Sequence, residues 1–211
     1  MDITQLILDE HAQQRALFAQ IDSIDAKDTE ALSALWTRLK NLLDAHAEAE
    51  ERFFYPRLMK IGTGGNDAES AAEETEDAIE DHNDIRDTGE AVDKHPVGSD
   101  AWFEAVGECN KANSDHLAEE ERQGLTDFRK HATLEERHEL GVRFAAFEAN
   151  HLNGVKVVDK DPEAYVKEHA PGWNYRRTVL LRTQEPRVPS AISRNPGLLR
   201  AQENDGASRE I

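Results

Sequence analysis

The sequence predicts an all-α protein: an up-down-up-down four-helix bundle with additional C-terminal helices and an extended tail. Apolar residues recur at spacings of three and four along four long segments, which is the period of a helix with one buried face. Short links separate these segments, as in antiparallel bundles. A set of histidines and glutamates also recurs in the second half of the bundle, at a nearly constant distance from its first appearance. Together these features predict a bundle built from two similar halves.

The first two helices are predicted from their capping residues. Asp2 can cap a helix that runs to about residue 23, because its carboxylate can accept a hydrogen bond from a free amide of the first turn. Asp28 offers the start of the second helix, whose apolar face continues to Pro56. Because proline has no backbone N–H donor, Pro56 should kink or end this helix.

A glycine-rich turn at residues 62–65 separates the two halves. Asn66 and Glu69 then form a capping pair for a third helix, which extends towards His95. Ser99 and Asp100 open the fourth helix. The second half therefore has the same helix–turn–helix plan as the first.

Two further helices follow the bundle. Thr133-x-x-Glu136 is a capping box, and Asp161 followed by Pro162 predicts a short helix at 162–169. We therefore expect a bundle over residues 1–130, additional helices packed on it over 131–172, and a basic, proline-containing tail over 173–211. This tail has seven arginines against four acidic residues, so it either lies along the acidic bundle or is disordered.

Composition limits the class of function. The chain has 211 residues, 38% of them hydrophobic, and a net charge of −18, which disfavours nucleic acids and anionic membranes as partners. No stretch approaches the roughly 18 apolar residues of a membrane-spanning helix, and the N-terminus does not resemble a signal peptide. The single cysteine, Cys109, fits a reducing compartment and should pack in the core. A cytoplasmic location is expected.

Six polar residues recur on the predicted buried faces, and the second half repeats the first at offsets of 71, 70 and 70 residues. Residues four apart lie one turn apart on the same helix face, so a His-x-x-x-Glu pair can direct both side chains to one point. Such groups are costly in an apolar core unless they are compensated, and two cations would remove that cost. The predicted metal ligands are His11, His46, Glu50, His82, His116 and Glu120.

These residues resemble the hemerythrin-like cation-binding, or HHE, domain over about residues 1–130. The motif HAEAEERFFYP at 46–56 is similar to the second-helix signature of that family, and HLAEEER at 116–122 to its fourth. The resemblance implies a bundle around two iron ions joined by an oxo or hydroxo bridge. It further implies that each half of the ligand set serves one iron: His11 with His46, and His82 with His116, with Glu50 and Glu120 bridging. The ligand types alone accept iron or manganese, so the choice of iron rests on the resemblance.

The pattern departs from that of oxygen-carrying hemerythrins, which have His-x-x-x-His on the third helix and His-x-x-x-x-Asp on the fourth. Here Ala78 and Arg86 lie one turn to either side of His82, and the fourth helix carries His-x-x-x-Glu. Each iron would then have two histidines and more open coordination positions. This favours reaction with O2, hydrogen peroxide or nitric oxide over simple oxygen storage.

Three functions remain open. The first is an enzyme that detoxifies peroxide or nitric oxide, as a peroxidase, a catalase-like protein or a nitric oxide-processing oxidoreductase, with the metal centre itself as the catalytic group. The second is a non-enzymatic protein that senses or stores O2, nitric oxide or iron. The third is a metal-free structural bundle. The expected partner is a small diatomic or peroxide ligand.

Three residues near the predicted ligands have open roles. Arg15 and Arg86 are related by the repeat, and they could orient an outer carboxylate or an incoming anion, or form ordinary surface ion pairs. Tyr55 could approach the metals, although ideal helical geometry places it opposite His46.

Two Glu-x-x-His motifs, at Glu135/His138 and Glu148/His151, match an element of ferritin-like di-iron proteins. That element must occur on separate facing helices. Both motifs lie on one predicted helix here, so surface or packing roles are expected for them.

Overall fold

The computed structural model describes residues 1–65 and 70–170, and over these residues the secondary structure is entirely helical. The contacts divide the chain into one unit, Met1–Trp173, and a second, Asn174–Ile211. The predicted tail and the predicted capping pair at Asn66 and Glu69 lie outside the described residues.

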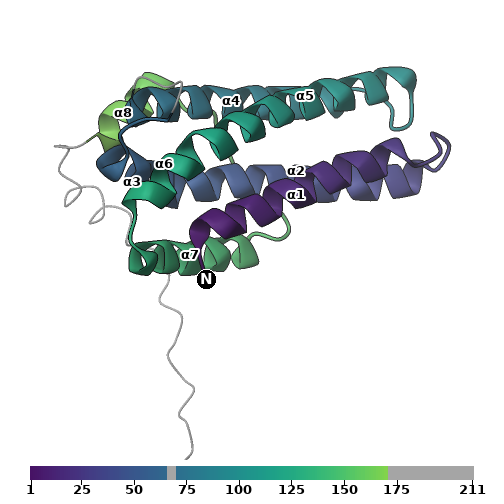
Figure 1. The fold of residues 1–211 in the computed structure, drawn as a ribbon. Helices are drawn as coiled ribbons and strands as arrows, with labels where there is room; N and C mark the ends of the chain where they lie inside the picture. Colours follow the sequence, from purple (N-terminus) through teal and green to yellow (C-terminus); the bar gives the residue numbers. More distant parts are fainter. Residues whose placement is uncertain (66–69, 171–211) are drawn as a thin grey trace, which may run out of the picture. The chain divides into compact units, whose positions relative to one another are not determined.

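Four long helices form the bundle, and the predicted all-α fold is confirmed. Helix α1 packs against α2 and α5, and α4 packs against the same two helices, so the four form a closed ring (Figure 1). Their order around the ring is α1, α2, α4, α5. The bounds are Ile3–Asp22 for α1, Thr29–Phe53 for α2, Ala71–Val92 for α4 and Asp100–Arg122 for α5.

The helices begin where capping side chains satisfy free backbone amides. Asp2 accepts a hydrogen bond from the Thr4 amide at 3.0 Å, and Asp28 and Ser99 cap α2 and α5 in the same way. These three predicted caps are confirmed. Helix α4 begins at Ala71 and is capped by Ser70.

Helices α2 and α5 both end in a break, close to the predicted ligands Glu50 and Glu120 respectively. Helix α2 stops at Phe53, and α3 (Tyr55–Ile61) follows with Pro56 in its first turn, as the sequence predicts. A similar break separates α5 from α6 (Gly124–His131), where no proline marks it, and this break was not predicted. Each break redirects the chain less than one turn after Glu50 or Glu120.

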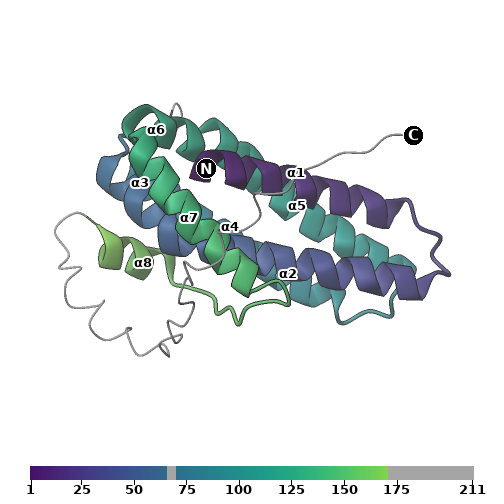
Figure 2. The ribbon, with the colours of Figure 1, turned by 90° about the horizontal axis from the view of Figure 1, so that it is seen from below.

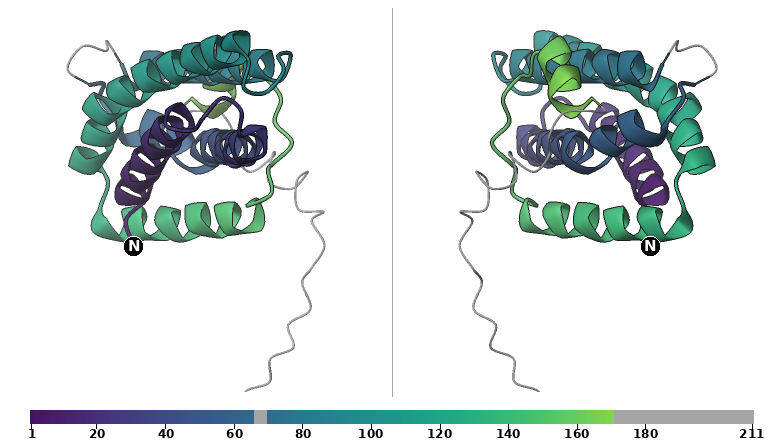
Figure 3. Two further views of the ribbon diagram at one scale, coloured as in Figure 1. Left: turned by 90° about the vertical axis from the view of Figure 1, so that its right-hand side faces the viewer. Right: turned by 90° about the vertical axis from the view of Figure 1, so that its left-hand side faces the viewer.

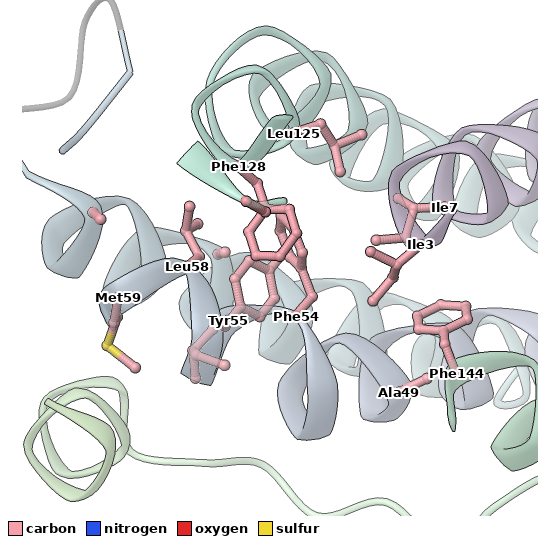
Figure 4. Close-up of a cluster of buried hydrophobic side chains, with 14 of the residues drawn as sticks. Ile3, Ile7, Ala49, Phe54, Tyr55, Leu58, Met59, Leu125, Phe128 and Phe144 are labelled. Atoms are coloured by element: carbon pink, nitrogen blue, oxygen red, sulfur yellow. The ribbon is translucent and has the colours of Figure 1, made fainter. Parts of the chain in front are cut away.

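Two clusters of apolar side chains fill the interior at opposite ends of the bundle. One includes Trp36, Trp102 and the buried Cys109; the other includes Phe54, Phe128 and residues of α3 and α6 (Figure 4). On α1, α2 and α4 the predicted metal ligands lie between residues of these two clusters, and on α5 they lie between Cys109 of one cluster and Leu125 of the other, at the start of α6. The polar site is therefore enclosed by hydrocarbon along the bundle axis.

Two further helices pack on the outside of the ring. Helix α7 (Leu134–Asn150) begins at the predicted Thr133/Glu136 capping box and crosses α1 and α2 (Figures 2 and 3). Helix α8 (Pro162–His169) has the predicted bounds, is capped by Asp161 and packs against α4. Within the described residues, every helix is too short or too polar to cross a membrane.

Candidate metal centre

The six predicted ligands meet in the interior of the bundle, and none of them exposes more than 4% of its surface. All four bundle helices contribute. We refer to these residues as the His/Glu cluster: His11 on α1, His46 and Glu50 on α2, His82 on α4, and His116 and Glu120 on α5.

Glu50 lies at the middle of the cluster. Its Oε1 is 3.1 Å from His46 Nε2 and 4.0 Å from His11 Nε2, whereas its Oε2 is 3.4 Å from His82 Nε2. His116 Nε2 lies 3.1 Å from His82 Nε2. Two groups that could each hold a metal ion therefore share Glu50, one with His11 and His46, the other with His82 and His116.

Glu120 is placed differently from Glu50. Its Oε2 is 3.2 Å from His11 Nε2, and its Oε1 accepts a hydrogen bond of 2.7 Å from the hydroxyl of Tyr55. Burial and the nearby Glu120 carboxylate raise the pKa of Tyr55 well above its ordinary value, so the phenol keeps its proton. The geometry thus gives Tyr55 a hydrogen bond to a cluster residue.

A second set of carboxylates, which was not predicted from the sequence, surrounds the cluster. Each of them forms a hydrogen bond with the Nδ1 atom of one histidine on a neighbouring helix. The pairs are Glu10 with His46 at 2.7 Å, Glu51 with His82 at 2.9 Å, Asp81 with His116 at 3.3 Å, and Glu121 with His11 at 3.0 Å. We call these four residues the outer carboxylates. A signal was present, because each directly precedes or follows a cluster residue in the chain.

The outer carboxylates fix the tautomer of the imidazoles. A carboxylate beside Nδ1 accepts the proton held there, so each neutral ring turns a lone pair on Nε2 towards the centre. In this tautomer the Nε2 atoms of His82 and His116, which lie 3.1 Å apart, present lone pairs to each other. Several inward-facing atoms, including His11 Nε2, His46 Nε2 and both oxygens of Glu50, have no hydrogen-bond partner among the described residues.

Converging lone pairs without protons are unfavourable in a buried site unless a cation lies between them. The donor set therefore fits a metal centre with imidazole and carboxylate ligands. Burial alone would lower the pKa of His46, but Glu50 and Glu10 outweigh burial and raise it well above the ordinary value. Burial would raise the pKa of Glu50, but His46 and His82 hold it well below its usual range. In the metal-free protein, a proton that Glu50 and Glu10 hold on His46 can therefore supply part of the positive charge that a metal ion would bring.

Comparison with known proteins identifies the family of the chain. The family model of the hemerythrin HHE cation-binding domain matches residues 2–141. The chain belongs to this family. A hemerythrin HHE cation-binding domain-containing protein from Mycobacterium kansasii has a similar crystal structure, with a TM-score of 0.63 and 20% sequence identity. The match covers 79% of this chain and 98% of that one. No curated protein matches the sequence.

In this HHE protein the two repeat-related arginines contact outer carboxylates. Arg86 Nη2 donates to Glu51 Oε1 at 2.6 Å, and Arg15 Nη2 lies 2.8 Å from Glu121 Oε1. Of the roles considered for them, the orientation of an outer carboxylate fits the buried pair of Arg86 with Glu51, whereas the pair of Arg15 with Glu121 is also a surface ion pair. Arg86 is buried, whereas 45% of the Arg15 side chain is exposed.

The segment that follows the HHE bundle holds one of the outer carboxylates. Lys160 Nζ contacts Glu51 Oε2 and lies 2.7 Å from Glu48 Oε2, and the hydroxyl of Tyr165 donates to the backbone carbonyl of Glu51. Two hydrogen bonds with Asn83 fix the backbone of Lys160. This segment therefore contributes directly to the surroundings of His82.

Helix α7 brings Glu148 to the opposite side of the centre. Surface or packing roles were expected for this residue, but the structure places it within reach of Glu10 and His46. Burial and the adjacent Glu10 raise the pKa of Glu148 to about 9. A protonated Glu148 can donate a hydrogen bond to the ionised Glu10, which keeps Glu10 available to His46.

Proposed function

We propose that the His/Glu cluster binds two iron ions and that the loaded protein removes hydrogen peroxide. The observation that carries the proposal is the sharing of Glu50 between two groups of donors, each with two histidines and few other ligands. Such sites leave coordination positions for a small ligand. Bound iron would supply redox capacity and Lewis acidity.

The side chains around the cluster suit this task. The outer carboxylates hold the Nδ1 protons, so the imidazoles keep one orientation and stay strong donors. Tyr55 holds a proton at Glu120 Oε1, in a position to stabilise a changing charge on that carboxylate. The apolar clusters at both ends exclude bulk water.

Disproportionation is the reaction we favour, because it converts two molecules of H2O2 into two of water and one of O2 and needs no external reductant. Reaction with O2 or nitric oxide uses the same open positions and is the nearest variant of the proposal. A non-enzymatic sensor or storage protein is the alternative, and it shares the metal site but not the turnover.

Protein produced in iron-replete medium provides the test. We expect about two iron ions per chain by metal analysis, and O2 release from peroxide well above that of the same amount of free iron. Glu50→Ala should lose both metals, because it removes the carboxylate common to both groups. His95→Ala, at an exposed histidine outside the cluster, is the matched control and should retain both.

The outcomes separate the alternatives. Two iron ions without O2 release would refute the catalytic part and favour sensing or storage. Absence of metal from the wild-type protein, with unchanged absorbance on titration with iron, would refute the site itself.

A further inference from the structure

A small cavity lies between α4 and α5 on the outer side of the His/Glu cluster. Its volume is about 20 Å³, enough for about one water molecule. Tyr55, His116 and Glu120 line its inner side, so it reaches the cluster. The other lining residues are Glu74, Asp77, Ala78, Asp81, Glu119 and Gln123.

The lining of this cavity is acidic, and burial together with nearby carboxylates raises the pKa of Glu74 to about 8. Five carboxylates line the cavity, and among the described lining residues there is neither a lysine nor an arginine. Elsewhere around the centre, Arg15, Arg86 and Lys160 neutralise outer carboxylates. A neutral molecule such as peroxide gains little from such a lining, whereas a divalent cation is attracted by it.

Glu74 gives the cavity a feature that an ordinary acidic surface lacks. Its side chain is 93% buried, from a relative exposure of 7%, and among the described residues neither carboxylate oxygen has a hydrogen-bond partner of good geometry. A buried carboxylate without a partner is unfavourable unless a proton or a cation joins it. The position of the Glu74 carboxylate depends on the glycine at 124, because a Cβ there would lie only 2.6 Å from Glu74 Oε1.

The lining forms a path along one face of α4. Glu74, Ala78 and Asp81 follow one another at helical spacing, and Asp81 holds His116. The small side chain of Ala78 leaves the space between the two carboxylates open. A hydrated divalent ion is too large for a cavity of this size, so it must exchange water for carboxylate oxygens as it passes.

We propose that this cavity is the route by which divalent metal ions reach the His/Glu cluster, with Glu74, Asp77 and Asp81 as transient ligands. The inference rests on the proposed metal centre and extends it from where the metals stay to how they arrive. The carboxylates of the route act on the rate of loading, and the cluster sets the final occupancy.

Metal uptake by the metal-free full-length protein tests the route, with Co²⁺ as the probe and its visible absorption as the signal after rapid mixing. The Glu74→Gln, Asp77→Asn double variant should take up Co²⁺ about tenfold more slowly than the wild type, with the same final occupancy. The matched control is Asp84→Asn, Asp87→Asn. It removes two exposed charges from the same helix, at positions that do not line the cavity.

Equal rates in the wild type and in both double variants would overturn the route and leave the metal centre intact. Equal slowing in both double variants would also overturn it, since overall charge would then explain the effect. No Co²⁺ uptake by the wild type would instead refute the metal centre on which the route depends. If the Glu74→Gln change prevents folding, as judged by circular dichroism, Asp77→Asn alone at its exposed position should still slow uptake severalfold.

Discussion

The outer carboxylates Glu51 and Glu121 occupy equivalent places in the two halves of the bundle, 70 residues apart, yet their surroundings differ. Glu51 is buried and contacts Arg86 and Lys160, whereas 30% of the Glu121 side chain is exposed and its cationic partner is the half-exposed Arg15. The difference comes from the segment after the bundle, which adds Lys160 to one half. The internal repeat thus gives the two halves the same types of residue, and the segment after the bundle makes the surroundings of the two halves unequal.

The largest effect of this inequality should appear in stability. Glu51→Gln leaves the buried Arg86 without its charged acceptor and Lys160 with Glu48 alone, so we expect the free energy of unfolding of the metal-free protein to fall by about 3 kcal/mol. Glu121→Gln removes a partly exposed pair and should cost less than about 1 kcal/mol. Urea denaturation measures both, and similar losses in the two variants would contradict the comparison.

Protonation of His46 should make the affinity for metal depend on pH. The pKa of His46 is raised in the metal-free protein, so below that pKa a metal ion must displace a proton. Glu50, whose pKa is lowered, stays ionised over the same range and adds no such competition. Affinity should therefore fall about tenfold for each pH unit below the pKa of His46. Competition with a chelator between pH 8 and pH 6 checks this, and a flat profile would count against it.

Lys160 offers a way to disturb one half alone. Lys160→Met removes the positive charge beside Glu51 and so alters the hydrogen bond between Glu51 and His82. One of the two metals should therefore bind about tenfold more weakly. Lys160→Arg should restore most of the affinity. Arg15→Met is the counterpart in the other half and should change affinity less than about threefold. A two-site chelator titration distinguishes these outcomes from a uniform loss at both metals.

The smallest expected effect concerns Tyr55, which breaks the symmetry from within the bundle. The position 70 residues later is Leu125, so Glu50 has no equivalent hydroxyl partner. Tyr55→Phe should lower the unfolding free energy by about 1 kcal/mol through loss of the hydrogen bond to Glu120. Thermal unfolding of the metal-free protein measures this change, and a loss below the precision of that measurement would show that the bond adds nothing.

The features that the sequence predicted well are local ones. The caps at Asp2, Asp28 and Thr133 act within one turn of their own helix, and the helix at 162–169 follows from two adjacent residues. The six cluster residues were brought together as expected, because helical spacing and the repeat place them on buried faces.

The features that were missed depend on contacts between distant segments. Lys160 meets Glu51 across 109 residues, and no spacing rule connects them. Glu10 and Glu121 are ordinary acidic residues in the sequence, and they become partners of histidines only when the neighbouring helix is in place. The break after Arg122 also lacks a local mark as strong as Pro56.

The outer carboxylates follow a circular order with a consequence for assembly. Helix α1 supplies the partner for a histidine of α2, α2 for α4, α4 for α5, and α5 for α1. A helix that slipped by one turn during folding would misplace both the carboxylate it gives and the histidine it presents. Misaligned chains would therefore lose donors in two places at once, so metal capture would select the chains in which all four helices have found their register.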